Sequence, residues 1–439
     1  MDKKNNLLMT NLNAKRKKTT PIWAGAMKTG HWYRISGDQP DLGLAPTPSG
    51  TRYLEDGDPA KDLNLNPSLS LEMSARRLLG RYAKAPWSGS CDFWSITETW
   101  NGAAFADYFG DSGSMIIFGG GHNDYFGSDV HAFNLATRQW SRISDGYVSE
   151  KMNEYGAGAI YEDACYPDDS PLPPHTYGYV QYDPVGNDYI LFKGQRQLGP
   201  EVEPIAIPHM LNLDTLRWRR GPKHPEAELK SGGWTAWDPM RRILWGNSGD
   251  DGNTFIGYSP DGQNKDGTFG TWGACQASKL PNSADHNAMA YDPTQDRLII
   301  AEHKKSRLLS INPAAPDEPI RTLISSPTTA IHPYASLEYA PKMNALIYCS
   351  ASNGGELFCI RKNGGSNIAD QNSETYSWEG ITAATNQLNP ITHAAKTSQY
   401  PTNVKQTFGR FRVASYDSVD IGILIRHIDS PVYVIKLPS

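Results

Sequence analysis

The sequence predicts an all-β fold, a six-bladed β-propeller, and three observations support this. One hairpin occurs six times, as a strand, a Tyr/Trp-Asp-Pro-like turn and a second strand that is almost wholly apolar. The period of about 50 residues is the length of one four-stranded blade. The 40 glycines and 10% aromatic residues are typical of short strands that turn tightly and pack against rings.

Each copy of the hairpin has a turn followed by a run expected to be buried. The turns are Asp107-Tyr108, Tyr182-Asp183-Pro184, Trp237-Asp238-Pro239, Tyr291-Asp292-Pro293, Tyr339-Ala340-Pro341 and Tyr416-Asp417. The runs start at Met115, Tyr189, Ile243, Leu298, Leu346 and Ile423. Such continuous apolar runs predict strands that are covered on both faces.

The hairpins also set the expected domain boundaries. A basic arm over 1–30 precedes one propeller domain over 31–439. The blades are expected at about 96–143, 175–220, 232–275, 284–325, 332–380 and 405–437. The last blade has only three strands, and segment 31–36 resembles the blade-ending strand around Trp140. We therefore expect segment 31–36 to complete the last blade and close the ring. Seven blades remain the alternative if the insertion 40–95 contains a degenerate one.

Composition excludes several classes of protein. The chain has 42 basic and 47 acidic residues, a net charge of −5, which disfavours nucleic acid as a partner. No apolar stretch has the length of a membrane span. Residues 2–18 lack the apolar core of a secretory signal, so we expect cytoplasmic synthesis with a virion location, or secretion if a signal was removed. Histidines without HxH or HxxxH spacing and five scattered cysteines predict no metal site and no cofactor.

Two segments resemble known propellers. GGGHNDYFGSDVHAFNLATRQW at 119–140 and the closing segment FGRFR…RHIDSPVYVIKL resemble the kelch/galactose-oxidase group. This resemblance implies a fold and little about activity. Segment 248–255, SGDDGNTF, matches the Asp-box turn of sialidase-type propellers, but no arginine triad that would hold a sialate is apparent.

Polar candidates gather on one rim of the predicted ring. His122 and Arg196 each lie four residues after a buried phenylalanine, so they are expected at equivalent corners of neighbouring blades, with Asn123 and Asp124 beside His122. Further candidates precede the innermost strands of several blades: His175, Tyr177, His286, His332, Tyr334 and Arg410. Alternatively, His122 caps loop carbonyls and Arg196 pairs with Asp124 as an inter-blade tie.

Two functions fit these residues, and the sequence leaves open whether the protein is an enzyme. We favour a non-catalytic interaction module that binds a protein or a polysaccharide, such as a phage tail or tail-hub component in a virion assembly or homo-oligomer. The alternative is a lyase that cleaves a uronate polysaccharide by β-elimination. Similarity to propeller-type ulvan lyases implies that Arg196 would clamp the carboxylate, His122 or His175 would be the base or its helper, and Tyr177 would be the acid.

Overall fold

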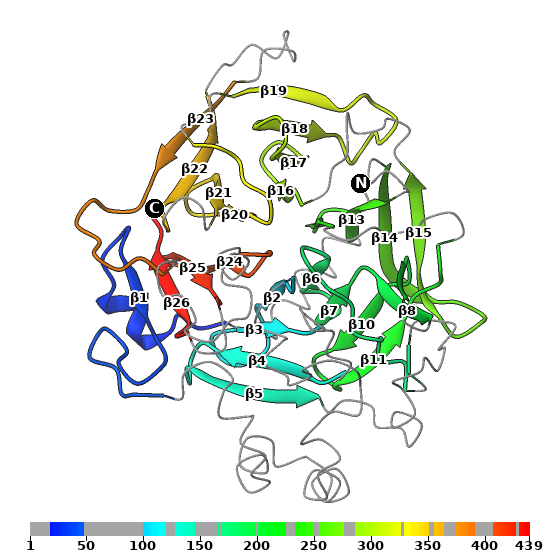
Figure 1. Ribbon diagram of the computed structural model, residues 1–439, viewed down its shortest axis with the longest axis horizontal. Coiled ribbons are helices and arrows are strands. Elements are labelled where there is room, and N and C mark those ends of the chain that lie inside the picture. The colour runs from blue at the N-terminus through cyan, green and yellow to red at the C-terminus, as the bar shows by residue number, and fades with distance from the viewer. Residues whose placement is uncertain are drawn as a thin grey trace, which may run out of the picture.

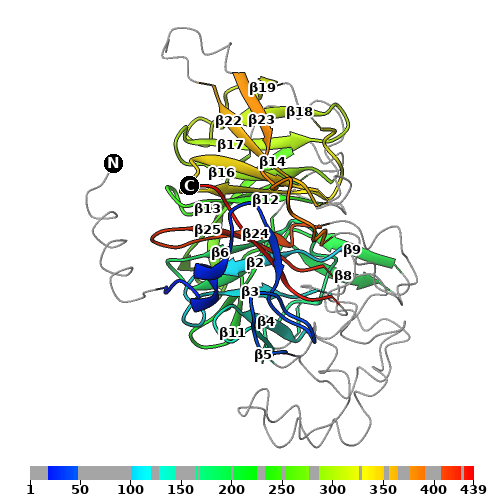
Figure 2. The ribbon, with the colours of Figure 1, turned by 90° about the vertical axis from the view of Figure 1, so that its left-hand side faces the viewer.

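Six antiparallel blades surround a central axis (Figure 1). The computed structural model describes residues 18–47, 100–119, 128–144, 165–166, 168–198, 201–224, 233–248, 254–275, 286–325, 329–350, 355–363, 375–390, 407–426 and 430–439. The strands in these segments form the predicted six-bladed propeller. In side view the blades form a thick disc (Figure 2).

The first three blades each run outward from an innermost strand next to the axis. They comprise β2 (Ala103–Ala106), β3 (Ser114–Ile117), β4 (Val130–Asn134) and β5 (Gln139–Ser144); β6 (Val180–Asp183), β7 (Asp188–Leu191), β10 (His209–Asn212) and β11 (Arg217–Arg220); and β12 (Thr235–Asp238), β13 (Ile243–Ser248), β14 (Thr254–Gln263) and β15 (Phe269–Cys275). A separate hairpin of β8 (Gly194–Leu198) and β9 (Glu201–Ile205) lies between β7 and β10 in the chain. This hairpin projects from one face of the disc (Figure 2).

The last three blades follow the same order. They comprise β16 (Ala288–Asp292), β17 (Arg297–Glu302), β18 (Arg307–Ile311) and β19 (Arg321–Ser325); β20 (Ser336–Ala340), β21 (Ala345–Cys349), β22 (Leu357–Lys362) and β23 (Thr375–Gly380); and β24 (Phe411–Ser415), β25 (Asp420–Leu424), β26 (Tyr433–Lys436) and β1 (Trp32–Arg34). The outermost strands β19 and β23 pair in parallel, which joins the fourth and fifth blades at their outer edges (Figure 1).

The N-terminal strand closes the ring as predicted. Strand β1 pairs antiparallel with β26, with Trp32 opposite Ile435 and Arg34 opposite Tyr433. The indole of Trp32 also packs edge-on against Phe411 of the same blade, with 6.4 Å between ring centroids. The pairing gives the last blade its fourth strand and covers an edge that would otherwise be open.

The recurring aspartate stabilises its own turn. Buried Asp183 accepts hydrogen bonds from the backbone N–H groups of Val185 and Gly186, at 2.9 and 3.1 Å. Asp238 and Asp292 cap the corresponding turns in the third and fourth blades. The motif recurs because each tight turn leaves N–H groups that a carboxylate two residues earlier can satisfy.

The hydrophobic core lies between neighbouring blades. The second strands β3, β7, β21 and β25 are buried along their whole length, which matches their apolar sequences. Phe118 of the first blade packs against Trp218 of the second, with 5.3 Å between ring centroids. Both faces of these strands are therefore covered, as a continuous apolar run requires.

The described N-terminal segment packs on the ring. It contains the 3₁₀-helix η1 (Ile22–Ala26), and the indole of Trp23 donates a hydrogen bond to the carbonyl of Leu135. Within the part of the chain that the structure describes, no helix is long and apolar enough to cross a membrane.

Candidate functional site

A group of large ring-bearing residues surrounds one mouth of the central channel. They lie just before the innermost strands of five blades, and all have left-handed backbone conformations. They are Trp100 (φ 63°), Tyr177 (φ 43°), His286 (φ 65°), Tyr334 (φ 59°) and Phe408 (φ 48°). We call these five residues the collar, and the adjacent end of the channel the collar mouth.

The left-handed conformation is costly for such residues. Bulky side chains with positive φ are outliers, and each costs on the order of 1–3 kcal/mol unless neighbours hold it. Here the backbones hold one another across blades. Tyr334 N–H donates to the carbonyl of His286 at 3.0 Å, Phe408 N–H to that of Tyr334 at 2.9 Å, and Tyr177 N–H to that of Trp100 at 2.6 Å. The collar is therefore an inter-blade structure and not a set of independent loops.

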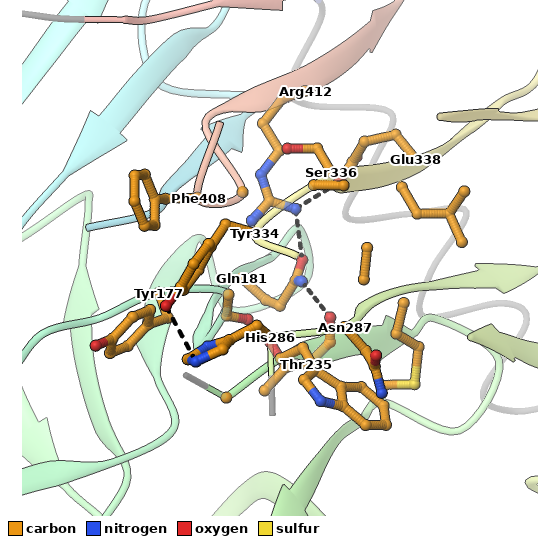
Figure 3. A pocket seen from close by; sticks show the side chains of 18 residues that line it. Tyr177, Gln181, Thr235, His286, Asn287, Tyr334, Ser336, Glu338, Phe408 and Arg412 are labelled. Atoms are coloured by element: carbon orange, nitrogen blue, oxygen red, sulfur yellow. Dashed lines mark hydrogen bonds and ion pairs between the residues drawn. The ribbon is translucent and has the colours of Figure 1, made fainter. Parts of the chain in front are cut away.

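The collar rings contact one another above the channel (Figure 3). Tyr334 lies at the centre, with ring centroids 4.1 Å from His286, 4.8 Å from Phe408 and 6.2 Å from Tyr177, onto which it stacks. The hydroxyl oxygen of Tyr334 is 3.0 Å from Nε2 of His286. Packing of aromatic rings and this polar contact fix the geometry of the group.

His175 extends the group at its margin. Its ring centroid lies 4.7 Å from that of Trp100 and 6.0 Å from that of Tyr177. His175, Trp100, His286 and Tyr334 are all partly exposed, whereas Tyr177 is 6% exposed. The collar mouth therefore offers aromatic faces and the imidazole of His175 to solvent in one place.

The third blade has no ring at the equivalent place in the described chain. Gly233 precedes β12, and a Cβ built there would lie 1.5 Å from Cζ of Tyr179. The carbonyl of Gly233 accepts a hydrogen bond from the N–H of Gly178 at 3.0 Å, so the inter-blade backbone link is kept without a side chain. Glycine is required here because the Tyr179 ring fills the space.

A small cavity lies beneath the collar (Figure 3). Its volume is about 30 Å³, about the share of one water molecule in the liquid, and Tyr177, His286, Tyr334 and Phe408 line it. Asn287 is 5% exposed and also lines the cavity, and its Nδ2 has no hydrogen-bond partner among the described residues. A ligand larger than water would therefore bind on the collar and not inside the channel.

A polar layer closes the channel below this cavity. The guanidinium of Arg412 donates to Oε1 of Glu338 at 2.5 Å and to the carbonyls of Ala103 and Val180. Arg412 also contacts Gln181 at 3.4 Å (Figure 3). Burial raises the pKa of Glu338, against the opposing charge of Arg412. One buried cation thus ties the first, second, fifth and sixth blades together.

A second cavity lies at the opposite end of the channel. Its volume is about 260 Å³, and the recurring turns line it, with Tyr182, Trp237, Tyr291 and Tyr339 among its walls. Arg412, Glu338 and Gln181 border both cavities. We call this end the turn mouth. The polar layer separates it from the collar mouth.

The structure brings together four of the sequence-predicted residues: His175, Tyr177, His286 and Tyr334. Two others lie nearby in different settings. His332 is partly exposed, and its backbone N–H donates to the hydroxyl of Tyr348. Arg410 is fully buried, with its guanidinium 5.5 Å from the Phe408 ring centroid.

The side chains of the remaining predicted residues are not among those that the structure describes. His122, Asn123 and Asp124 lie outside the described residues. Arg196 lies in β8, where its backbone pairs with Glu203, and its side chain is not among those described. Their roles stay predictions.

Sequence reasoning missed two members of the collar, Trp100 and Phe408. Both lie three residues before an innermost strand, as Tyr177 does, so the same offset that pointed to Tyr177 could have found them. Neither ring carries an acid or a base, so no candidate chemistry pointed to these two residues.

Comparison with known proteins gives no family for this chain. No family model and no curated protein matches its sequence. Among solved structures, the major Malassezia sympodialis allergen Mala s 1 aligns at 8% identity and a TM-score of 0.41, over 78% of this chain and 93% of that chain. A protein of unknown function from Bacteroides thetaiotaomicron aligns at 9% identity and a TM-score of 0.40, over 77% of this chain and 69% of that chain. These likenesses are too distant to carry an argument about the site.

Proposed function

We propose that this propeller is a non-catalytic binding module whose collar mouth recognises a glycan. The observation that carries this proposal is the collar itself, where five blades hold a ring-bearing residue in a left-handed conformation around one mouth. Strain of this kind is kept where the surrounding structure serves a function. The fold alone suits an interaction module and does not name the partner.

A sugar suits the chemistry of this surface. The C–H face of a pyranose ring is apolar and flat enough to lie on an aromatic ring, as Tyr334 and Trp100 present them. Sugar hydroxyls donate and accept hydrogen bonds, which the imidazole of His175 and the hydroxyl of Tyr334 can match. Nucleic-acid bases also stack on rings, but a chain with a net charge of −5 is a poor partner for phosphates.

The test compares two tyrosines at opposite ends of β20. Tyr334 belongs to the collar and Tyr339 lines the turn mouth, and both are partly exposed. Oligosaccharide binding is measured by calorimetry for the wild type, Tyr334→Ala and Tyr339→Ala. We expect Tyr334→Ala to lose binding and Tyr339→Ala to keep it. Equal losses in both variants, or no binding of any oligosaccharide to the wild type, would contradict the proposal.

A lyase activity is the second candidate, and the pair of Tyr334 and His286 favours it. A phenol oxygen 3.0 Å from an imidazole nitrogen is the arrangement that a β-elimination can use for proton transfer. This pair would replace His122 and Tyr177 in the sequence-based hypothesis. The activity would appear as ultraviolet absorbance of an unsaturated product from a uronate polysaccharide, lost in His286→Ala. If the protein binds the polysaccharide but forms no unsaturated product, the result supports the non-catalytic binding module.

The identity of the biological partner stays a prediction. A protein partner, a virion assembly and a homo-oligomer were all expected from the sequence, and a glycan-binding propeller is compatible with a tail component that adheres to a cell surface.

A further inference from the structure

A lysine lies buried beside the collar. Lys193 follows Phe192 at the end of β7 and is 2% exposed. Its Nζ lies 5.1 Å from the ring centroid of Tyr179 and 5.9 Å from that of Tyr177. Tyr177 therefore lines the cavity under the collar and also contacts this ammonium group.

The charge of Lys193 has no partner of opposite sign among the side chains that the structure describes. Several arginines of the ring, by contrast, form ion pairs: Arg412 with Glu338, Arg242 with Asp183, and Arg219 with Asp188. For Lys193 the described contacts are only the faces of two tyrosine rings. Cation–π contact offsets a small part of the cost of burial.

Burial without a counter-charge is expensive, and it lowers the pKa of Lys193 to about 7. A methionine or leucine would fill the same space without this cost, so packing does not explain a lysine at this position. A buried cation next to a binding surface is instead ready to receive an anion, which would restore the missing counter-charge.

We propose that Lys193 is the anion-binding residue of the collar, so that the glycan recognised there is an acidic sugar. This inference rests on the proposed glycan binding. The shared chemistry is an anionic substituent on a pyranose, either a carboxylate or a sulfate ester. The sugar ring lies on the partly exposed ring of Tyr334, and its anionic group is directed past the Tyr177 ring toward Nζ of Lys193.

The experiment uses matched probes on the whole chain. Oligogalacturonate, the same oligomer with its carboxyl groups esterified, and a sulfated neutral galactan are titrated into the wild type and Lys193→Met. We expect the acidic probe to bind Lys193→Met about ten- to hundredfold more weakly, the range of one charged hydrogen bond. The esterified probe should bind both proteins equally. The two acidic probes distinguish a carboxylate from a sulfate.

Two controls keep the result interpretable. Lys342→Met removes the same charge from an exposed site at a turn of the fifth blade and should leave every affinity unchanged. Lys193→Gln provides a second neutral variant in case methionine disturbs folding, and thermal unfolding shows which variants are native.

The outcomes separate the two proposals. If Lys193→Met and Lys193→Gln bind the acidic probe as tightly as the wild type does, the role of Lys193 is wrong and glycan binding stands. If the wild type binds no probe at all, the proposed function fails together with this inference.

Discussion

Left-handed backbone conformations occur at both mouths of the channel, but mostly in different types of residue. At the turn mouth, the left-handed residues include Asn187 (φ 54°), Arg242 (φ 54°), Asp296 (φ 52°) and Asn344 (φ 50°), and three of these four are Asn or Asp, which tolerate this conformation. At the collar mouth, four of the five left-handed residues are Trp, Tyr or Phe, for which this conformation is an outlier, and only His286 is of a type that adopts it more often. Turn geometry accounts for the first group, whereas the second needs a reason beyond the turn.

The tyrosines differ in the same way. At the turn mouth, Tyr182, Tyr291 and Tyr339 each donate a hydrogen bond to the left-handed residue of their own turn, at 2.8, 2.8 and 2.9 Å. At the collar, the hydroxyl of Tyr334 meets His286 of the neighbouring blade. Repetition at the turn mouth thus indicates a structural device. Variation at the collar, which includes a glycine in the third blade, is what the proposed binding surface would require.

The largest effect is expected in the polar layer between the mouths. Arg412→Met leaves Glu338 without its counter-charge in a buried setting and should lower the free energy of unfolding by about 3–5 kcal/mol. Arg412→Met with Glu338→Met should lose less, because both charges are then gone. Denaturant unfolding measures both variants. Equal losses would mean that the carbonyl contacts of Arg412, and not its charge, hold the blades together.

A smaller loss is expected from the recurring aspartate of the turn mouth. Asp183→Ala removes two backbone hydrogen bonds and the ion pair with Arg242, and should cost about 3 kcal/mol. Asp107 belongs to the same repeat, but its side chain is 36% exposed, and its ion pair is with Lys18. Asp107→Ala should therefore cost less than about 1 kcal/mol. A similar loss at both positions would contradict the structural role assigned to the buried copies.

The pH dependence of stability tests the collar side of the comparison. Below about pH 7, Lys193 is protonated in both the folded and unfolded states, so the full cost of burying its charge is present. Between about pH 7 and its ordinary value of 10.5, only the unfolded state keeps the proton, so stability rises with pH. The contribution of Lys193 should amount to about 2.5 kcal/mol over two pH units.

Comparison with Lys193→Met isolates this contribution. Unfolding curves of the two proteins are recorded across the same pH range, and their difference removes the titration of other groups. The variant should be more stable near neutral pH, and its advantage should shrink as the pH rises. A difference that does not change with pH would mean that Lys193 is charged in the folded protein throughout.

The fold could be predicted from sequence because the signals repeat. Each apolar run such as Tyr189–Phe192 requires cover on both faces, and each buried aspartate such as Asp183 marks a turn. The N-terminal strand was predicted from one resemblance, and the pairing of Trp32 with Ile435 confirms that the ring closes there. Because the signal occurs in several copies, misreading one copy does not change the predicted fold.

The site could be predicted only in part. Position before an innermost strand identified His175, Tyr177, His286 and Tyr334, because that position fixes the rim on which a side chain lies. The left-handed conformation depends on hydrogen bonds between blades, and sequence patterns do not report it. Lys193 was missed because it follows Phe192 at the end of a buried run, where only the fold reveals a cation without a counter-charge.

The smallest expected effects come from removing one hydroxyl at each mouth. Tyr339→Phe deletes the hydrogen bond to Asn344 and should lower stability by about 0.5–1 kcal/mol without changing glycan affinity. Tyr334→Phe keeps the collar ring but removes the hydroxyl next to His286, and should weaken glycan binding severalfold. Calorimetric titration gives the glycan affinity of each variant, and thermal unfolding gives the stability of each. If Tyr339→Phe weakened glycan binding and Tyr334→Phe did not, the turn mouth would be the recognition surface and the comparison would be reversed.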